Sequence, residues 1–178
     1  MSASDVVRAS RDGDQFHYLW AARRILKLLL PGSNLIAVTI EGASPEEVKG
    51  GEKIDTAEQI IDLAEYYGSE EIKKADLVRY VQVKHSTYRS NDPWPPSGLR
   101  KTLKGFADRY LALRKEIGGV GIGERLQFCF VTNRPVNSSV IQTIEDAANA
   151  VASRHPKILK SSKSILNLTT LKCHSFSV

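Results

Sequence analysis

The chain has 178 residues, 42% of them hydrophobic and 25% charged, which is typical of one folded domain with a sizeable core. Lysine and arginine outnumber aspartate and glutamate by 25 to 20, a surplus that favours a polyanionic partner, although weakly. The absence of a long apolar run, of an apolar leader and of more than two cysteines argues against a membrane span, a signal peptide and a disulfide framework. We expect a cytoplasmic domain without a membrane partner, in which Cys129 is a buried free thiol.

The first half of the chain predicts one helix followed by three strands. Apolar residues at helical spacing predict a helix over residues 14–30, which the sequence PGSN ends. Its expected core face consists of Tyr18, Ala21, Ala22, Ile25 and Leu29. Runs rich in apolar and β-branched residues predict strands at 34–42, 59–68 and 79–87.

The second half alternates helices with strands. A helix is expected from about Ser97, because six apolar residues at steps of four and three form one stripe: Leu99, Leu103, Phe106, Tyr110, Leu113 and Ile117. A strand at 125–133, a helix at 137–154 with Ser139 and Gln142 as a capping box, and a possible strand at 164–173 follow. Three consecutive strands and then alternation predict an α/β fold, with helices on both faces of a mixed sheet of four or five strands.

Four polar residues interrupt the apolar strands where they can meet at one end of the sheet. Glu41 ends the first strand, Asp62 follows two isoleucines, and Gln82 and Lys84 share one face of the third strand. The two carboxylates suit Mg²⁺, and the amide oxygen of Gln82 would be a neutral third ligand. Lys84, whose charged form the carboxylates favour, would position the attacking water or stabilise the transition state. This set indicates metal-dependent hydrolysis of a phosphodiester.

Each of these residues also has an ordinary structural interpretation. Asp62 alone fits a turn or a sheet edge, Glu41 before Gly42 fits a strand end, and Gln82 with Lys84 fits a solvated strand face. Only their combination on neighbouring strands favours a site. His85 has the pKa range of a general base, but alternation places it towards the valines of its strand, and we interpret it as structural.

At these residues the sequence resembles the PD-(D/E)xK nuclease superfamily, in the form D…QxK. Asp62 matches the first acidic residue, and Gln82 and Lys84 match the triplet. Five segments between residues 16 and 135 are similar to the double-stranded DNA endonuclease domain of bacterial anti-phage effectors, which is found in CBASS-associated proteins and on antiviral STAND (AVAST-type) ATPases: FHYLWAARR, VTIEG, DLAEYYG, VQVKHS and FVTNRP.

The resemblance implies a restriction-endonuclease-like α/β/α sandwich that binds Mg²⁺, with Mn²⁺ as a substitute, through Glu41, Asp62 and Gln82. It further implies that residues 1–178 form a single nuclease domain, the N-terminal part of a longer bacterial protein. A sensor or ATPase domain in the same parent chain and homo-oligomerisation would restrain and activate it. His17, an accessory candidate, departs from the glutamine that the family often carries there, and Gln82 replaces the commoner glutamate.

Candidate contacts to double-stranded DNA lie beside this set. Ser86 shares the face of Lys84, and the second helix offers three cations among its polar residues: Arg100, Lys101 and Lys104. Arg109 is expected on the polar side of the same helix, and Lys157, Lys160 and Lys163 form a further basic cluster. Trp94 fits either stacking on DNA or local packing. Two other functions stay open: a catalytically inactive nucleic-acid-binding module of the same fold, and a protein-interaction domain whose basic charge is incidental.

Overall fold

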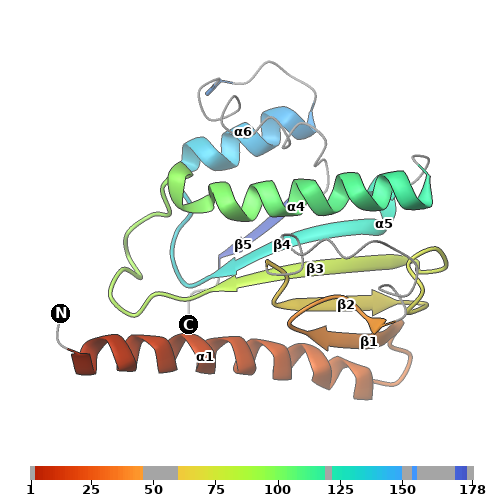
Figure 1. Cartoon of the computed structure of the whole chain (residues 1–178), viewed down its shortest axis with the longest axis horizontal. Helices are drawn as coiled ribbons and strands as arrows, with labels where there is room; N and C mark the ends of the chain where they lie inside the picture. The colour runs from red at the N-terminus through yellow and green to blue at the C-terminus, as the bar shows by residue number, and fades with distance from the viewer. Residues whose placement is uncertain (1–2, 46–59, 119–121, 150–153, 156–170, 176–178) are drawn as a thin grey trace.

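The computed structural model describes residues 3–45, 60–118, 122–149, 154–155 and 171–175 (Figure 1). Its elements in chain order are α1 (Ala3–Ile25), η1 (Leu26–Leu29), β1 (Leu35–Ile40), β2 (Leu63–Tyr67), β3 (Leu77–Lys84), α4 (Pro96–Ile117), α5 (Ile122–Arg125), β4 (Leu126–Thr132), α6 (Ser138–Ala148) and β5 (Leu171–Ser175). In the part of the chain that is described, no helix combines the length and apolarity that a membrane span needs.

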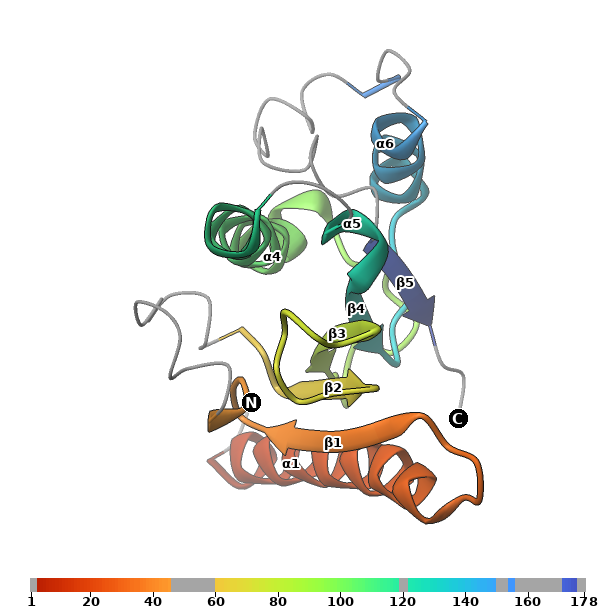
Figure 2. The same cartoon turned by 90° about the vertical axis from the view of Figure 1, so that its right-hand side faces the viewer.

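The strands form one five-stranded mixed sheet in the order β1-β2-β3-β4-β5. β1, β2 and β3 pair antiparallel, whereas β4 is parallel to both β3 and β5. Figure 2 shows α1 against one face of this sheet and α4 on the other. The predicted α/β architecture with helices on both faces is therefore confirmed.

The helix predicted from its stripe is confirmed as α4, which starts at Pro96, where proline is favoured in the first turn. Five of the six stripe residues are buried, and Ile117 packs partly buried beside them. The expectation for Arg109 is wrong, because its side chain is buried with the guanidinium 5.4 Å from the ring centroid of Tyr80. Burial lowers the pKa of Arg109 to about 10. The long alkyl stem lets this residue take a core position that a charge pattern does not reveal.

The N-terminal helix differs from its prediction in length and in orientation. α1 begins at Ala3 rather than at residue 14, and a 3₁₀ turn, η1, replaces its last residues. Of the five residues expected on its core face only Ala21 is buried, and Tyr18 and Leu29 are among the most exposed large side chains. Phe16 and Trp20 pack instead against the core under α1. Apolar residues occur on several sides of this helix, so their spacing alone did not indicate which side meets the sheet.

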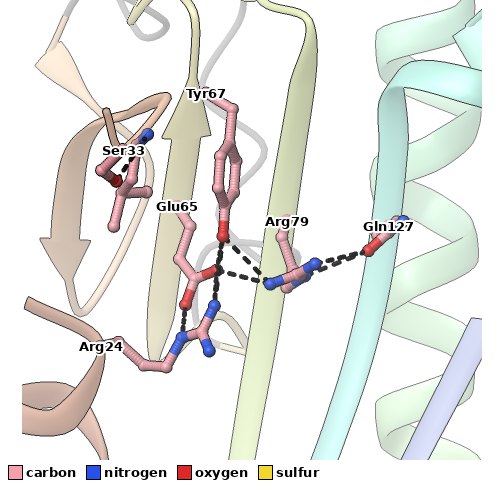
Figure 3. Close-up of polar contacts among 7 residues, drawn as sticks. Arg24, Ser33, Glu65, Tyr67, Arg79 and Gln127 are labelled. Carbon is pink, nitrogen blue, oxygen red and sulfur yellow. Dashed lines mark hydrogen bonds and ion pairs between the residues drawn. The ribbon is translucent and has the colours of Figure 1, made fainter. Parts of the chain in front are cut away.

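A buried polar network determines which side of α1 faces the sheet (Figure 3). The carboxylate of Glu65 on β2 accepts hydrogen bonds from Arg24 of α1, from Arg79 of β3 (2.9 Å) and from the hydroxyl of Tyr67 (2.8 Å). Arg79 also donates to Gln127 on β4 at 3.0 and 3.1 Å. Burial alone would raise the pKa of Glu65, but the hydrogen bond and charge of Arg24, helped by Tyr67 and Arg79, hold it below its usual value. The network joins α1 to three strands.

The last helix ends earlier than predicted, and the last strand ends two residues later. α6 ends at Ala148 instead of residue 154, and the capping box is wrong: the side chain of Asn137 accepts the bonds of the backbone N–H and hydroxyl of Ser139. Gln142 instead contacts the ring of His155 at 2.9 Å. β5 extends the sheet at Leu171–Ser175, and the predicted residues 164–170, like the lysines 157, 160 and 163, lie outside the described residues. Cys129 is a buried thiol, as predicted.

Candidate functional site

The pairing of β2 with β3 brings Asp62 and Gln82 to the same end of the hairpin. The antiparallel register matches Leu63 with Val81, so Asp62 and Gln82 lie one step beyond, at the end of the hairpin that is away from its turn. The backbone N–H of Asp62 donates to the carbonyl of Val81 at 3.0 Å. Its carboxylate accepts a 2.6 Å hydrogen bond from the backbone N–H of Val83. Strand pairing therefore closes the separation of about twenty residues between Asp62 and the QxK triplet.

Glu41 lies beside Asp62 in a strained turn after β1. Its backbone N–H donates to the carbonyl of Asp62 at 3.0 Å, and its φ of 57° is in the left-handed region, which is uncommon for a residue other than glycine. The hydroxyl of Thr39 donates to the carbonyl of Gly42 at 2.7 Å and steadies this turn. Strain of this kind tends to persist where a side chain must point in a particular direction.

One pocket collects the acidic residues and part of α1. Its volume is roughly 470 Å³, a value that includes space open to solvent. Its walls come from α1, the end of β1, the start of β2 and Val83. Its ionisable lining residues are Asp14, His17, Glu41 and Asp62. Sequence reasoning missed Asp14, although its position three residues before His17 places both on one side of a helix.

Gln82 and Lys84 lie on the other face of the sheet from this pocket. Val81 and Val83 pack in the core under α1, whereas Tyr80 packs in the core under α4. Alternation therefore directs Gln82 and Lys84 towards α4, and neither lines the pocket. Asp62, at the strand end, is where the two faces meet.

The charges around Asp62 link the two faces. Burial raises the pKa of Asp62, the hydrogen bond from Val83 and the charges of His17 and Lys84 act against this, and Glu41 adds to the rise. The net effect is a pKa above the usual value of an aspartate. Asp62 is therefore in electrostatic contact with three of the residues that the sequence singles out, two of them in the pocket and one behind the strand.

Lys84 is half-buried, which corrects one expectation. Burial lowers its pKa; the charge of Asp62 acts in the opposite, predicted direction but does not compensate, and the charge of Lys101 lowers the pKa further. The ammonium nitrogen lies 5.6 Å from the ring centroid of Trp94. Trp94 packs against the core between α4 and α6 and donates its indole N–H to Thr132 at 2.9 Å, so packing explains it better than stacking on DNA.

The buried amide oxygen of Gln82 has no hydrogen-bond partner among the described residues. A buried acceptor without a donor costs about 1–3 kcal/mol, so such an atom invites a donor or a cation. The carboxylates of Asp62 and Glu41 are hard oxygen donors that share one pocket, which fits Mg²⁺ bound through few protein ligands and several waters, whereas the amide of Gln82 lies on the other face of the sheet. Within the described ranges no three His, Cys, Asp or Glu side chains are grouped to hold a metal ion, so an ion in the pocket would depend on water for most of its ligands.

The neighbouring residues 85 and 86 have structural contacts. The ring of His85 packs on Phe16 with centroids 4.9 Å apart, on the valine side as expected, and burial lowers its pKa. The backbone N–H of Ser86 donates to the side chain of Asn133 at 2.9 Å, and its hydroxyl accepts a bond from Arg89. Ser86 therefore connects the ends of β3 and β4.

The proposed DNA-binding cations differ in their surroundings. Arg100 and Lys101 are exposed on α4, and Lys101 is close enough to Lys84 to influence it. Lys104 forms an ion pair with Asp108 at 2.6 Å, one helical turn away, which reduces the charge it offers to a phosphate. The first two residues are thus the stronger candidates.

The arrangement suits chemistry on a charged substrate at the end of a strand pair. It offers the carboxylate oxygens of Asp62 and Glu41 to a hard cation, with the half-buried ammonium of Lys84 on the other side of the strand. Comparison with models of known protein families gives no match, and neither does comparison with curated proteins.

Proposed function

We propose that the chain is a metal-dependent endonuclease domain that hydrolyses phosphodiester bonds of double-stranded DNA with little sequence preference. The observation that carries the proposal is the position of Asp62. It is hydrogen-bonded to Val81 and Val83 on either side of Gln82, it shares a pocket with Glu41, and the charge of Lys84 acts on it. In the PD-(D/E)xK superfamily that the sequence resembles, the acid and the triplet likewise lie on neighbouring strands of a hairpin. The mixed α/β sheet is compatible with the restriction-endonuclease-like fold that we infer.

The residues assigned to Mg²⁺ are Asp62, Glu41 and Gln82. One carboxylate oxygen of Asp62 is held by the N–H of Val83, which fixes its direction and leaves the other oxygen for a ligand. The amide oxygen of Gln82 is buried without a donor on the α4 side of the sheet, and the resemblance to the superfamily assigns it as a neutral ligand. When bound, Mg²⁺ would lower the pKa of a water molecule and offset charge on the phosphate.

Lys84 is assigned to the developing negative charge of the transition state. Its ammonium is half-buried, and a charge shielded from water acts more strongly on a nearby phosphate than one in bulk solvent. It carries out this role while protonated. His17, which lines the pocket and whose charge acts on Asp62, is assigned an accessory role at the phosphate.

DNA would be held mainly through its phosphates. Arg100 and Lys101 on α4 extend the positive charge from Lys84, and affinity that depends on such contacts falls steeply with salt. By the resemblance, the domain would belong to a longer bacterial anti-phage protein. A sensor or ATPase domain and homo-oligomerisation would then restrain it until it is activated.

The test is cleavage of supercoiled plasmid by the wild type and by Lys84→Met, with Mg²⁺ or with EDTA. Lys74→Met is the matched control, since it removes an exposed lysine that is paired with Glu71 and lies outside the proposed site. We expect cleavage by the wild type and the control, none in EDTA, and a loss of about 100-fold or more in Lys84→Met. Cleavage by Lys84→Met at the wild-type rate would contradict the assignment.

A catalytically inactive nucleic-acid-binding module is the second candidate. The amide at position 82 and the lack of a group of three metal-binding side chains among the described residues favour it. The same assay decides between the two. Salt-dependent DNA binding without cleavage in Mg²⁺ or Mn²⁺, in every oligomeric or activated state, would support the binding module.

A further inference from the structure

Trp94 is fixed in the structure from several directions. Its backbone N–H donates to the carbonyl of Pro135 at 2.8 Å, and its carbonyl accepts the N–H of Asn137 at 3.3 Å. These bonds flank an isolated parallel bridge between Trp94 and Val136. The indole N–H is bound to the hydroxyl of Thr132. Backbone and ring are therefore held independently.

The indole ring also has close neighbours. The ring packs against the cluster of buried apolar side chains between α4 and α6, where the edge contact to Phe130 has a centroid distance of 6.1 Å. The guanidinium of Arg134 lies 4.2 Å from the ring centroid and is itself held by the carbonyls of Asp92 and Pro93 at 2.8 and 3.3 Å. An aromatic ring held in this way is a rigid surface.

Lys84 lies on that surface. The parallel register pairs Lys84 directly with Thr132, the residue that binds the indole N–H. Within the described part of the chain, the Lys84 ammonium makes no hydrogen bond and no ion pair, whereas it lies 5.6 Å from the Trp94 ring centroid. That distance is within the range of a cation–π contact. The indole is thus the close, fixed partner of a flexible side chain with four rotatable bonds.

We propose that Trp94 is a positioning residue for Lys84, whose ammonium the indole face holds beside Asp62 before DNA binds. This inference rests on the proposed function, because it explains how Lys84 is prepared for the transition state. A lysine held in place loses less freedom when the reaction begins. Trp94 has no assigned contact with DNA, so removing it should lower kcat and leave KM for DNA nearly unchanged.

The first experiment detects the contact between Lys84 and Trp94 and does not depend on cleavage. The lysines are reductively methylated with ¹³C, and the Lys84 signal is assigned by its absence in Lys84→Arg. We expect this signal to be shifted upfield by the ring current of the indole, and to move to the position of exposed lysines in Trp94→Leu. A wild-type Lys84 signal that coincides with those of exposed lysines would overturn the inference. This outcome can be observed even if no variant of Trp94 folds.

The second experiment measures cleavage kinetics. Trp94→Leu should lose about tenfold in kcat, and Trp94→Phe, which keeps an aromatic face, should lose less. Val140→Ala is the control, because it disturbs the same apolar cluster without removing the edge contact of Phe130 that holds the indole. A folded Trp94→Leu with kcat within twofold of the wild type, or a control with an equal loss, would overturn the inference. If the wild type shows the upfield signal but never cleaves, the positioning contact stands and the proposed function fails.

Discussion

Replacing Glu65 with glutamine tests how α1 is held on the sheet. The carboxylate is fully buried and faces two guanidinium groups, those of Arg24 and Arg79, which are 15% and 25% exposed. Removing one member of a buried ion pair costs about 3–5 kcal/mol. Because both arginines retain some access to water, we expect the lower end, about 3 kcal/mol. For a domain of this size that corresponds to a decrease in Tm of roughly 6–12 °C.

The assay is thermal unfolding of the wild type, Glu65→Gln and a control, followed by circular dichroism. Glu71→Gln is matched to it, because Glu71 also pairs with a cation, Lys74, but their side chains are 53% and 67% exposed. Exposed pairs contribute at most about 1 kcal/mol, so the control should lose no more than about 4 °C. Equal losses in Tm for the two variants would refute the interpretation that Glu65 anchors α1.

The same network predicts a dependence on pH. The pKa of Glu65 in the folded chain lies below its ordinary value of 4.5, so its ionised form is favoured by folding. The stabilisation is therefore fully present above pH 4.5 and is lost as the pH falls through the lower folded pKa. The difference in Tm between wild type and Glu65→Gln should be constant near neutral pH and shrink in acid. A difference that stays the same down to the acid limit would contradict this assignment.

Three further predictions concern the site. Asp62→Asn should lose most Mg²⁺ affinity in calorimetric titration as well as cleavage, and an unchanged titration would count against Asp62 as a ligand. Gln82→Glu should retain cleavage and bind Mg²⁺ more tightly, because a carboxylate replaces a neutral oxygen; a complete loss of activity would show that position 82 has another role. Cleavage should decline as the pH rises and Lys84 loses its proton. Because burial lowers the pKa of Lys84 from 10.5, this decline should begin at a lower pH than the deprotonation of an exposed lysine. Lys84→Arg should shift the decline or remove it.

The sequence predicted well those elements whose apolar residues follow a single periodic pattern. The apolar residues of α4 lie on one side of the helix only. In β3 apolar and polar residues alternate, β4 is a nearly continuous apolar run, and clear breaks bound both strands. The register of β2 against β3 then follows from which faces must be buried, and it brings Asp62 to the end of the hairpin where Gln82 lies. Those two contributions explain why the sequence could bring Asp62 and the end of β3 together, although it did not show that Gln82 and Lys84 face away from the pocket.

The wrong predictions for α1 and α4 have a common physical origin: arginine combines a long apolar stem with a charged end. Arg109 enters the core through its alkyl stem, and Arg24 faces the sheet because Glu65 is buried beneath it. Neither partner can be recognised before the fold places them together. For the same reason Asp14 in the pocket and the contact of Trp94 with Lys84 were missed: each depends on the placement of two elements that are distant in sequence.

The location of a bound divalent ion is the most direct test of the proposed site. Crystals grown with Mn²⁺ would be measured at its absorption edge, and the anomalous difference map would be inspected around the end of the β2–β3 pair. We predict a peak within about 2.5 Å of a carboxylate oxygen of Asp62, with Glu41 or Gln82 among the other ligands. A map whose strongest peak lies away from Asp62, or that has no peak at saturating Mn²⁺, would contradict the proposed metal site.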